Sequence, residues 1–252
     1  MSLFDSFDPS SEELIQVTMQ RSFQSTEDFP EVVIAAFKEE TFHLLEKVCP
    51  TEQIGTLREG RTIPVYRLHW RGRKIGIYHS LAGGAGTVCL LEQIFARGAK
   101  KVLLYGNCGI LDRAITSGHL ILPFEAYRDE GTSYHYLPVS DYVKIPTHVH
   151  LARVFDSLHL PYVTGRVWTT DAFYRETRSN MEKRKADGCI AVDMECASAM
   201  AASQFRGIPV YQFFYADDCL DGTVWDPRTM GAMPASGHEK YLRVALEVAA
   251  RL

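Results

Sequence analysis

The stretch CIAVDMECASAMAASQFRGIPVYQFFY, residues 189–215, decides the fold class. It begins with an apolar run at 189–192, continues with an alanine- and methionine-rich segment at 195–205 that predicts a helix, and ends in an aromatic, apolar run at 210–215. Runs that are apolar throughout are typical of strands in a parallel sheet, because helices cover both faces of such a sheet. The stretch therefore predicts a strand–helix–strand unit of the α/β class.

The same alternation recurs along the chain. Strands are predicted at 32–37, 101–105 and 120–123, a hairpin around a turn at 71–73, and helices at 38–48, 88–97, 148–158 and 239–252. The glycine clusters at 83–86 and 106–109 follow strands, and each is expected to be a loop or tight turn. We expect one α/β domain at 31–252, with a mainly parallel central sheet covered by helices on both faces, after an N-terminal arm at 1–30.

The composition is that of an ordinary globular chain. A hydrophobic content of 46% over 252 residues is enough for one sizeable core. The net charge of -4 creates no general attraction for polyanions, so neither nucleic acid nor a membrane is expected as a partner. Six cysteines without paired spacing are expected to be reduced and buried. The chain shows no apolar export or spanning segment, and the cytoplasm is the expected location.

Carboxyl groups at the ends of two predicted strands are the candidates for chemistry. Glu195 follows the strand at 189–192 and starts a helix, whose dipole favours the ionised carboxylate. A carboxylate accepts two hydrogen bonds, which suits the 2′ and 3′ hydroxyls of a ribose. Asp217 and Asp218 follow the strand at 210–215, where an apolar wall and a neighbouring acid favour a raised pKa and a general acid. Ordinary helix-start and loop-capping acids are the alternatives.

Together these segments resemble the nucleoside phosphorylase family, which includes hexameric purine nucleoside phosphorylases, uridine phosphorylases and related nucleosidases. The resemblance runs from about Val32 to the C-terminal helix. Three motifs carry it: Val-Asp-Met-Glu at 192–195, Thr-Asp-Ala-Phe-Tyr at 170–174, and Arg-Asp-Glu-Gly-Thr-Ser-Tyr-His-Tyr-Leu-Pro at 128–138. Their order along the chain is more specific than any one of them. The resemblance implies a pentosyltransferase that cleaves the N-glycosidic bond of a ribonucleoside.

The resemblance also assigns roles to residues of this sequence. Met194 and Glu195 would hold the ribose, Phe173 would pack against the nucleoside, and Asp218 would donate a proton to N7 of a purine. The substrate-binding set it implies, with the turn at 106–109, is Asn107, Cys108, Gly109, Phe173, Asp193, Met194 and Glu195. A purine is favoured, because the Gln and Arg with which uridine phosphorylases bind their base look like Thr177 and Ser179 here, with Arg178 between them.

The phosphate site matches the family less well. By resemblance Arg61 reaches a neighbouring subunit's phosphate, which implies a homo-oligomer, a dimer or hexamer, with Arg61 near the interface; a solvated arginine is the alternative. The usual Gly-Asp-Pro motif is replaced by Ala-Phe-Lys-Glu-Glu at 36–40, and a second arginine by Leu104. Lys38 and Asn107 remain as phosphate ligands. The segment at 36–40 is closer to that of a nucleosidase, in which Glu40 would activate water.

Three functions are therefore open. The first is phosphorolysis, with inorganic phosphate as co-substrate, a free base and ribose 1-phosphate as products, and no metal or organic cofactor. The second is hydrolysis with water activated by Glu40. The third is a catalytically weak nucleoside-binding protein that has lost turnover with its phosphate-binding arginines.

Overall fold

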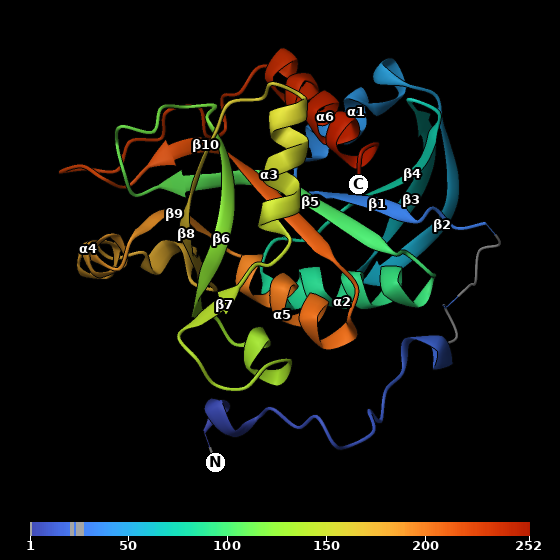
Figure 1. Cartoon of the computed structure of the whole chain (residues 1–252), viewed down its shortest axis with the longest axis horizontal. Helices are drawn as coiled ribbons and strands as arrows, with labels where there is room; N and C mark the ends of the chain where they lie inside the picture. Colours follow the sequence, from blue (N-terminus) through green and yellow to red (C-terminus); the bar gives the residue numbers. More distant parts are fainter. Residues whose placement is uncertain (1, 21–22, 24–27) are drawn as a thin grey trace.

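A ten-stranded β-sheet with helices on both faces forms the centre of the molecule (Figure 1). The computed structural model describes residues 2–20, 23 and 28–252. The strands are β1 (Val32–Ala36), β2 (Thr51–Glu59), β3 (Arg61–Trp70), β4 (Arg73–His79), β5 (Lys101–Ile110), β6 (Leu120–Asp129), β7 (Tyr142–Lys144), β8 (Tyr162–Thr170), β9 (Cys189–Asp193) and β10 (Val210–Cys219). The helices are α1 (Glu39–Val48), α2 (Gly84–Ala96), α3 (His148–Ser157), α4 (Arg178–Ala186), α5 (Cys196–Arg206) and α6 (Ala235–Ala249). Short 3-10 helices are η1 (Leu3–Asp5), η2 (Val17–Met19), η3 (Thr132–His135) and η4 (Phe173–Arg175).

The centre of the sheet is parallel and part of its periphery is antiparallel. The strand order is β10-β6-β8-β9-β5-β1-β4-β3-β2, with β7 paired to β6. Strand β1 runs parallel to β4 and to β5, and β5 runs parallel to β10, as predicted. Strands β2, β3 and β4 form an antiparallel meander, because tight turns such as the one at 71–72 reverse the chain without a crossover.

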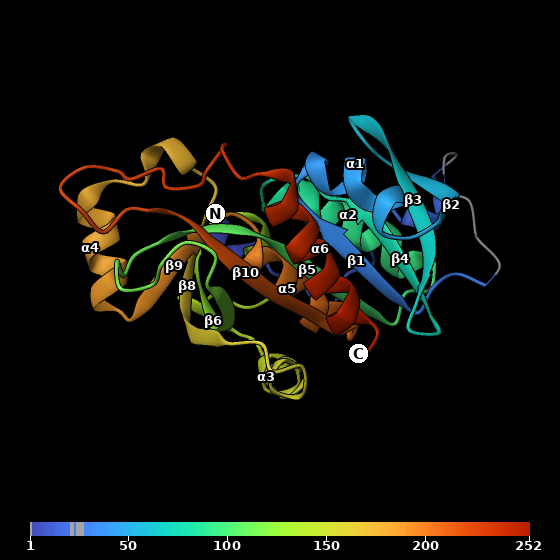
Figure 2. The same ribbon diagram turned by 90° about the horizontal axis from the view of Figure 1, so that it is seen from above.

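One end of the sheet closes on itself. Strand β10 pairs with β5 as well as with β6, so that β5, β10, β6, β8 and β9 form a ring of paired strands. The ring brings the carboxyl end of β5 beside β9, through the pairs Gly109–Val192 and Ile110–Ala191. Figure 2 shows α4 beyond this ring, at the opposite end of the molecule from β2 and β3.

Two hydrophobic cores lie on opposite faces of the sheet. Side chains alternate between the faces of a strand, and in β1 Val33 packs in one core while Ile34 packs in the other. Helices α2 and α5 cover the first face, and α1, α3 and α6 cover the second (Figure 1). The α/β class and the helices on both faces are thus confirmed.

The N-terminal residues 2–20 run along the α2 and α5 side of the domain (Figure 1). The Phe7 ring meets Phe205 edge to face, with ring centroids 6.5 Å apart. Glu13 Oε1 forms an ion pair with Arg206 Nη1 at 2.8 Å. The arm therefore covers part of α5 rather than extending away from the domain.

The glycine clusters are used for close packing instead of turns. Residues 106–109 continue β5, so the turn expected there is wrong. A Cβ on Gly106 would lie 3.0 Å from the Phe37 ring, and one on Gly109 would lie 2.8 Å from Leu220 and 2.9 Å from Val192. Gly84 begins α2 instead of ending a loop, and it packs directly on Ser198 of α5. Neighbouring side chains leave no room for a Cβ at these positions, so glycine is required. A local sequence pattern does not show which side chains will be neighbours.

Sequence patterning found most other elements but missed β2, β7, β8 and α4. Strand β2 lies at an edge and exposes many of its side chains, so it lacks a continuous apolar run. Helix α4 buries Met181 alone among its nine residues, so it lacks apolar helical periodicity. Five of the six free cysteines are buried as expected, whereas Cys89 is exposed on α2. In the described residues no helix is both long and apolar enough to cross a membrane.

Replacing Phe155 of α3 by Ala is expected to lower the free energy of unfolding by about 3–5 kcal/mol. The Phe155 side chain is fully buried, and its ring packs edge to face on Phe213 of β10 and Tyr162 of β8. Val149→Ala is the matched control in the same helix, because Val149 is exposed. Denaturant unfolding of both variants tests the prediction, and a Phe155→Ala loss no larger than that of the control would contradict it.

Candidate active site

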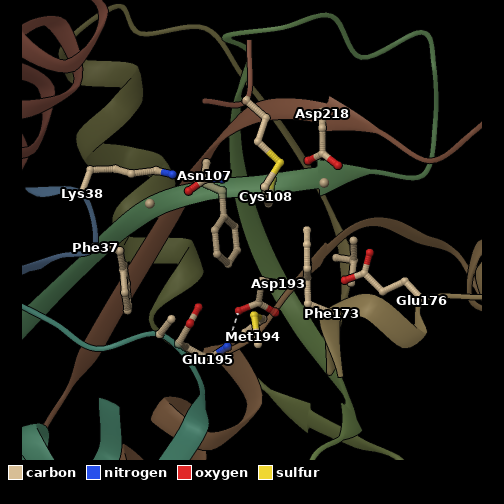
Figure 3. Close-up of a pocket in the computed structure, with 16 residues that line it drawn as sticks. Phe37, Lys38, Asn107, Cys108, Phe173, Glu176, Asp193, Met194, Glu195 and Asp218 are labelled. Carbon is tan, nitrogen blue, oxygen red and sulfur yellow. Dashed lines mark hydrogen bonds between the residues drawn. The ribbon is translucent and has the colours of Figure 1, made fainter. Parts of the chain in front are cut away.

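A cavity of about 270 Å³ opens where the carboxyl ends of β1, β5, β9 and β10 converge (Figure 3). This volume suits a small molecule rather than a polymer. The convergence follows from the topology, because parallel strands place their carboxyl ends at one edge of a sheet. The lining residues are Phe37, Lys38, Ala82, Gly106, Asn107, Cys108, Gly109, Phe173, Glu176, Val192, Asp193, Met194, Glu195, Phe214, Asp218 and Met230.

An irregularity in β10 separates the two adjacent aspartates. The pairing with β5 shifts between Ala216 and Asp218, which leaves Asp217 as the extra residue of a bulge. Asp217 Oδ1 accepts a hydrogen bond from Thr229 Oγ1 at 2.7 Å and does not line the cavity. Asp218 lines it, and Figure 3 shows its carboxyl group directed inward. The bulge therefore makes Asp218 the available acid.

Trp225 holds the Asp218 carboxyl group in place. The indole Nε1 of Trp225 donates to Asp218 Oδ2 at 2.7 Å, while Oδ1 lies over Gly109. Burial raises the pKa of Asp218, and the Trp225 hydrogen bond opposes that shift. A carboxyl group with a raised pKa can retain a proton for donation. No sequence motif marks Trp225, and it lies in a segment without regular structure.

Glu195 reaches across from the start of α5 to the start of α2. Its Oε1 accepts a hydrogen bond from the Gly83 amide at 2.7 Å, so the second carboxyl oxygen remains for a ligand. Burial, then the negative charge of Asp193, raises the pKa of Glu195. These two effects outweigh the preference for the ionised carboxylate that was expected from the helix dipole. Glu195 is the residue that precedes α5, and its side chain does not cap the helix.

Asp193 has both carboxyl oxygens occupied by the protein. Oδ1 accepts from Thr169 Oγ1 at 2.7 Å, and Oδ2 accepts from the amides of Glu195 at 2.9 Å and Cys196 at 2.7 Å. Burial raises the pKa of Asp193, and these three hydrogen bonds counteract the shift. Asp193 thus anchors the start of α5 and fixes the position of Glu195.

The remaining predicted ligands of the nucleoside meet in the same cavity. Asn107 and Cys108 come from β5, Phe173 from η4, and Met194 from the turn between β9 and α5. Figure 3 shows Lys38 and Glu195 on one side of the cavity and Asp218 and Phe173 on the other, with the Lys38 amino group directed toward Asn107. One end of the cavity therefore carries the Lys38 cation, and the other carries Asp218 with the Phe173 ring.

Two predicted residues lie outside the cavity. Glu40 is exposed in the first turn of α1, where a hydrogen bond from its own backbone amide lowers its pKa. Arg61 is exposed at the first residue of β3. Burial, and after it the charge of Arg61, lowers the pKa of His79, whose ring bonds the carbonyl oxygen of Phe37 at 3.2 Å. Arg61 is therefore close to the Lys38 side without lining the cavity of its own chain.

The motif residues nearest to the predicted base subsite have structural partners. Thr177 Oγ1 accepts from the Asn180 amide at 3.4 Å and caps α4. The Arg178 guanidinium donates to the carbonyl oxygens of Gly222 at 2.7 Å and Thr223 at 2.6 Å. Neither Thr177 nor Ser179 lines the cavity.

The motif at 128–138 is likewise internal to the fold. The Arg128 side chain is buried and donates to Ser133 Oγ at 2.8 Å and to the Pro138 carbonyl at 2.7 Å. It shapes the η3 loop instead of binding a ligand.

The family model of the phosphorylase superfamily matches residues 31–248. The chain belongs to the phosphorylase superfamily. The matched residues include the whole sheet, α1 to α5, α6 up to residue 248 and every residue that lines the cavity.

The curated proteins that match this chain are distant in sequence. The chain is 24% identical over 190 residues to a purine nucleoside phosphorylase of Plasmodium vivax, covering 73% of this chain and 76% of that protein. It is 32% identical over 114 residues to a uridine phosphorylase of Thermococcus kodakarensis, covering 43% and 41%. The match to the uncharacterized mimivirus protein R802 spans 54% of that protein's length, at 29% identity over 55% of this chain.

Solved structures of the phosphorylase superfamily share the fold. The Toxoplasma gondii purine nucleoside phosphorylase, solved with immucillin-H, has a TM-score of 0.76 at 22% identity, covering 92% of this chain and 97% of that one. The Vibrio fischeri uridine phosphorylase has a TM-score of 0.75 at 20% identity, covering 93% and 100%. At these identities the likeness establishes the architecture.

Proposed function

We propose that this phosphorylase-superfamily protein is a nucleoside phosphorylase that cleaves the N-glycosidic bond of a purine ribonucleoside with inorganic phosphate. The products are the free base and ribose 1-phosphate. The observation that carries the proposal is the single cavity that brings together Lys38, Glu195 and Asp218. In the proposal Lys38 serves the phosphate, Glu195 the ribose and Asp218 the departing base.

The residues divide the work along the cavity. Glu195 accepts hydrogen bonds from the ribose hydroxyls, and Asp193 keeps it in place. Phe173 packs against the base, while Asp218 donates a proton to the base as the C1′–N bond breaks and its electron pair passes to the base nitrogen. A phosphate oxygen then forms the new bond to C1′. Holding the reactants in line supplies a large part of the rate acceleration.

Phosphate binds at the Lys38 end in this proposal. Lys38 is the single cation among the described residues that line the cavity. The same lining contains four carboxyl groups, those of Glu176, Asp193, Glu195 and Asp218. A dianion needs more positive charge than one lysine gives. Arg61 of a second subunit supplies it if the protein is a homo-oligomer, since Arg61 is exposed near this end of the cavity.

The location of Glu40 favours phosphorolysis over hydrolysis. A residue that activates water must reach the sugar carbon, yet Glu40 is exposed and does not line the cavity. The pairing of a free ribose-binding oxygen on Glu195 with an inward Asp218 favours turnover over binding alone.

Product analysis tests the proposal. Inosine, adenosine and uridine are incubated with the protein, with and without phosphate, and the sugar product is identified. We expect ribose 1-phosphate from the purine nucleosides only when phosphate is present. Lys38→Met should raise the phosphate concentration required, because it removes the one cation of the lining, whereas Lys47→Met, an exposed change on α1, should not. Free ribose formed without phosphate would contradict phosphorolysis, and binding without products would contradict catalysis.

A further inference from the structure

A further carboxyl group, that of Glu176, lies at the Asp218 end of the cavity. Glu176 follows η4, is partly buried, and lines both this cavity and an adjoining hollow formed with Tyr174, Met181 and Trp225. Figure 3 shows Glu176 and Asp218 on the same side, away from Lys38 and Glu195. Glu176 comes two residues after the aromatic motif at 170–174.

Hydrogen bonding distinguishes the two acids. Asp218 Oδ2 accepts from Trp225, and the positive charge of Arg228 also favours ionised Asp218. The Glu176 carboxyl group accepts no hydrogen bond from any residue in the described part of the chain. An ionised carboxylate is stabilised by donors, and a carboxyl group without them favours its neutral form.

The charges around Glu176 act in the same direction. Asp218 of β10 and Asp193 of β9 are negative, and Glu195 lies across the cavity. Arg178 of α4 lines the adjoining hollow, but its guanidinium donates to backbone carbonyls. Burial, then the charges of Asp218 and Asp193, raises the pKa of Glu176 to about 8.

We propose that Glu176 and Asp218 act as a carboxyl pair that holds one proton for the departing base, and that Glu176 stores this proton in the free protein. Two neighbouring carboxyl groups do not both ionise readily, because the second charge forms against the repulsion of the first. Trp225 favours the ionised state of Asp218, which leaves the proton on Glu176. This proposal rests on the proposed function.

The step is balanced in protons and electrons. When the purine binds, the shared proton moves to Asp218, which faces the base, and Glu176 becomes the ionised member. The C1′–N bond breaks with its electron pair on the base nitrogen, and the base takes the proton from Asp218. Hydrogen phosphate loses a proton as it forms the ester to C1′, and that proton returns to the pair through solvent. Glu176 is therefore a positioning residue for the proton, and Asp218 is the catalytic residue.

Replacing Glu176 by Gln is expected to move the alkaline limb of the kcat profile to lower pH. Glu176, with its pKa raised to about 8, keeps a proton on the pair up to that pH, whereas Asp218 in E176Q keeps Asp217 as a charged neighbour but lacks Glu176 and loses its proton at lower pH. For inosine with phosphate, E176Q should lower kcat by about 10-fold or more at pH 8 and by less than about threefold at pH 6. A p-nitrophenyl riboside should be cleaved at the wild-type rate at both pH values, because its phenolate departs without a proton.

The control is Glu182→Gln, an exposed change on α4 that should leave both substrates and the pH profile unaltered. An equal loss at both pH values and with both substrates in E176Q would show a merely structural role and overturn the proposal. So would an unchanged alkaline limb.

Infrared difference titration separates this proposal from the proposed function. Burial raises the pKa of Glu195 to about 8 as well, so the comparison is made in a Glu195→Gln background. A protonated carboxyl band should disappear near pH 8 in Glu195→Gln and be absent when E176Q is added, with no turnover required. The same titrating band in the double variant would overturn the assignment of the proton to Glu176. Failure of the wild-type protein to form ribose 1-phosphate would instead contradict the proposed function.

Discussion

Replacing Glu195 by Gln is expected to lower kcat/KM for purine ribonucleosides by about 100-fold. The carboxylate oxygen that Gly83 leaves free accepts hydrogen bonds from the ribose hydroxyls in the proposed complex. Each of the two hydrogen bonds to the ribose contributes up to about 1.5 kcal/mol, and about 1.4 kcal/mol corresponds to a factor of ten, so the loss of both accounts for the expected fall. A glutamine keeps the hydrogen bond from Gly83 with its carbonyl oxygen. It presents its amide NH2 group, a donor, to the sugar in place of the second carboxylate oxygen. Steady-state kinetics with inosine and saturating phosphate measure the loss.

The nucleoside itself provides the control for this variant. In 2′,3′-dideoxyinosine both hydroxyls are missing, so wild-type protein and Glu195→Gln should cleave it with similar efficiency. An equal loss on inosine and the dideoxy analogue would indicate that the substitution disturbs the start of α5 instead of the ribose contact, and would contradict the assigned role. Circular dichroism of the variant checks that the fold is intact.

Replacing Asp218 by Asn is expected to lower kcat for inosine by about 10²–10⁴-fold, the usual contribution of a general acid. An asparagine has nearly the same shape and keeps an oxygen for the Trp225 hydrogen bond, but it carries no transferable acidic proton. The departing base must then leave as an anion. Rapid measurement of base release with phosphate present tests the expected loss.

Asp217→Asn is the matched control for Asp218→Asn. Asp217 is the adjacent residue in β10 and is equally buried, but it bonds Thr229 and lies outside the cavity. We expect Asp217→Asn to lower stability without a comparable loss of kcat. Equal losses of kcat in the two variants, or an unaltered rate in Asp218→Asn, would contradict the role given to Asp218.

Local sequence patterns predicted the elements whose apolar residues follow one another without interruption. The runs at 32–37 and 210–215 became β1 and β10, because apolar residues in each run are buried on both faces of the sheet. The helix after Glu195 was found for a similar reason, since most of α5 is buried against α2 and the sheet. Element ends were less accurate. Strand β5 extends through 106–109 because its pairing with β10 continues there, and pairing is not visible in a local pattern.

The site residues were predicted to the extent that they follow strands. Lys38, Asn107, Phe173, Glu195 and Asp218 were all expected to contact substrate or phosphate, and all line one cavity. Glu40 has a suitable side chain and a suitable place in the sequence, but α1 turns it to the exposed surface. Trp225 and Glu176 were not predicted, since the loop after β10 must fold back to bring Trp225 to Asp218, and Glu176 gains its environment from β9 and β10.

The sequence by itself determined the α/β class, the family resemblance and the acids at the strand ends, because these depend on residue types in local order. The tertiary structure decided what each acid does. The bulge in β10 separated Asp218 from Asp217, the amides of α5 occupied Asp193, and the Gly83 amide oriented Glu195. Burial among other carboxyl groups raised the pKa values of Glu195, Asp218 and Glu176. Ionisation depends on the charges and donors that surround a group in space, and the folded chain alone brings these together.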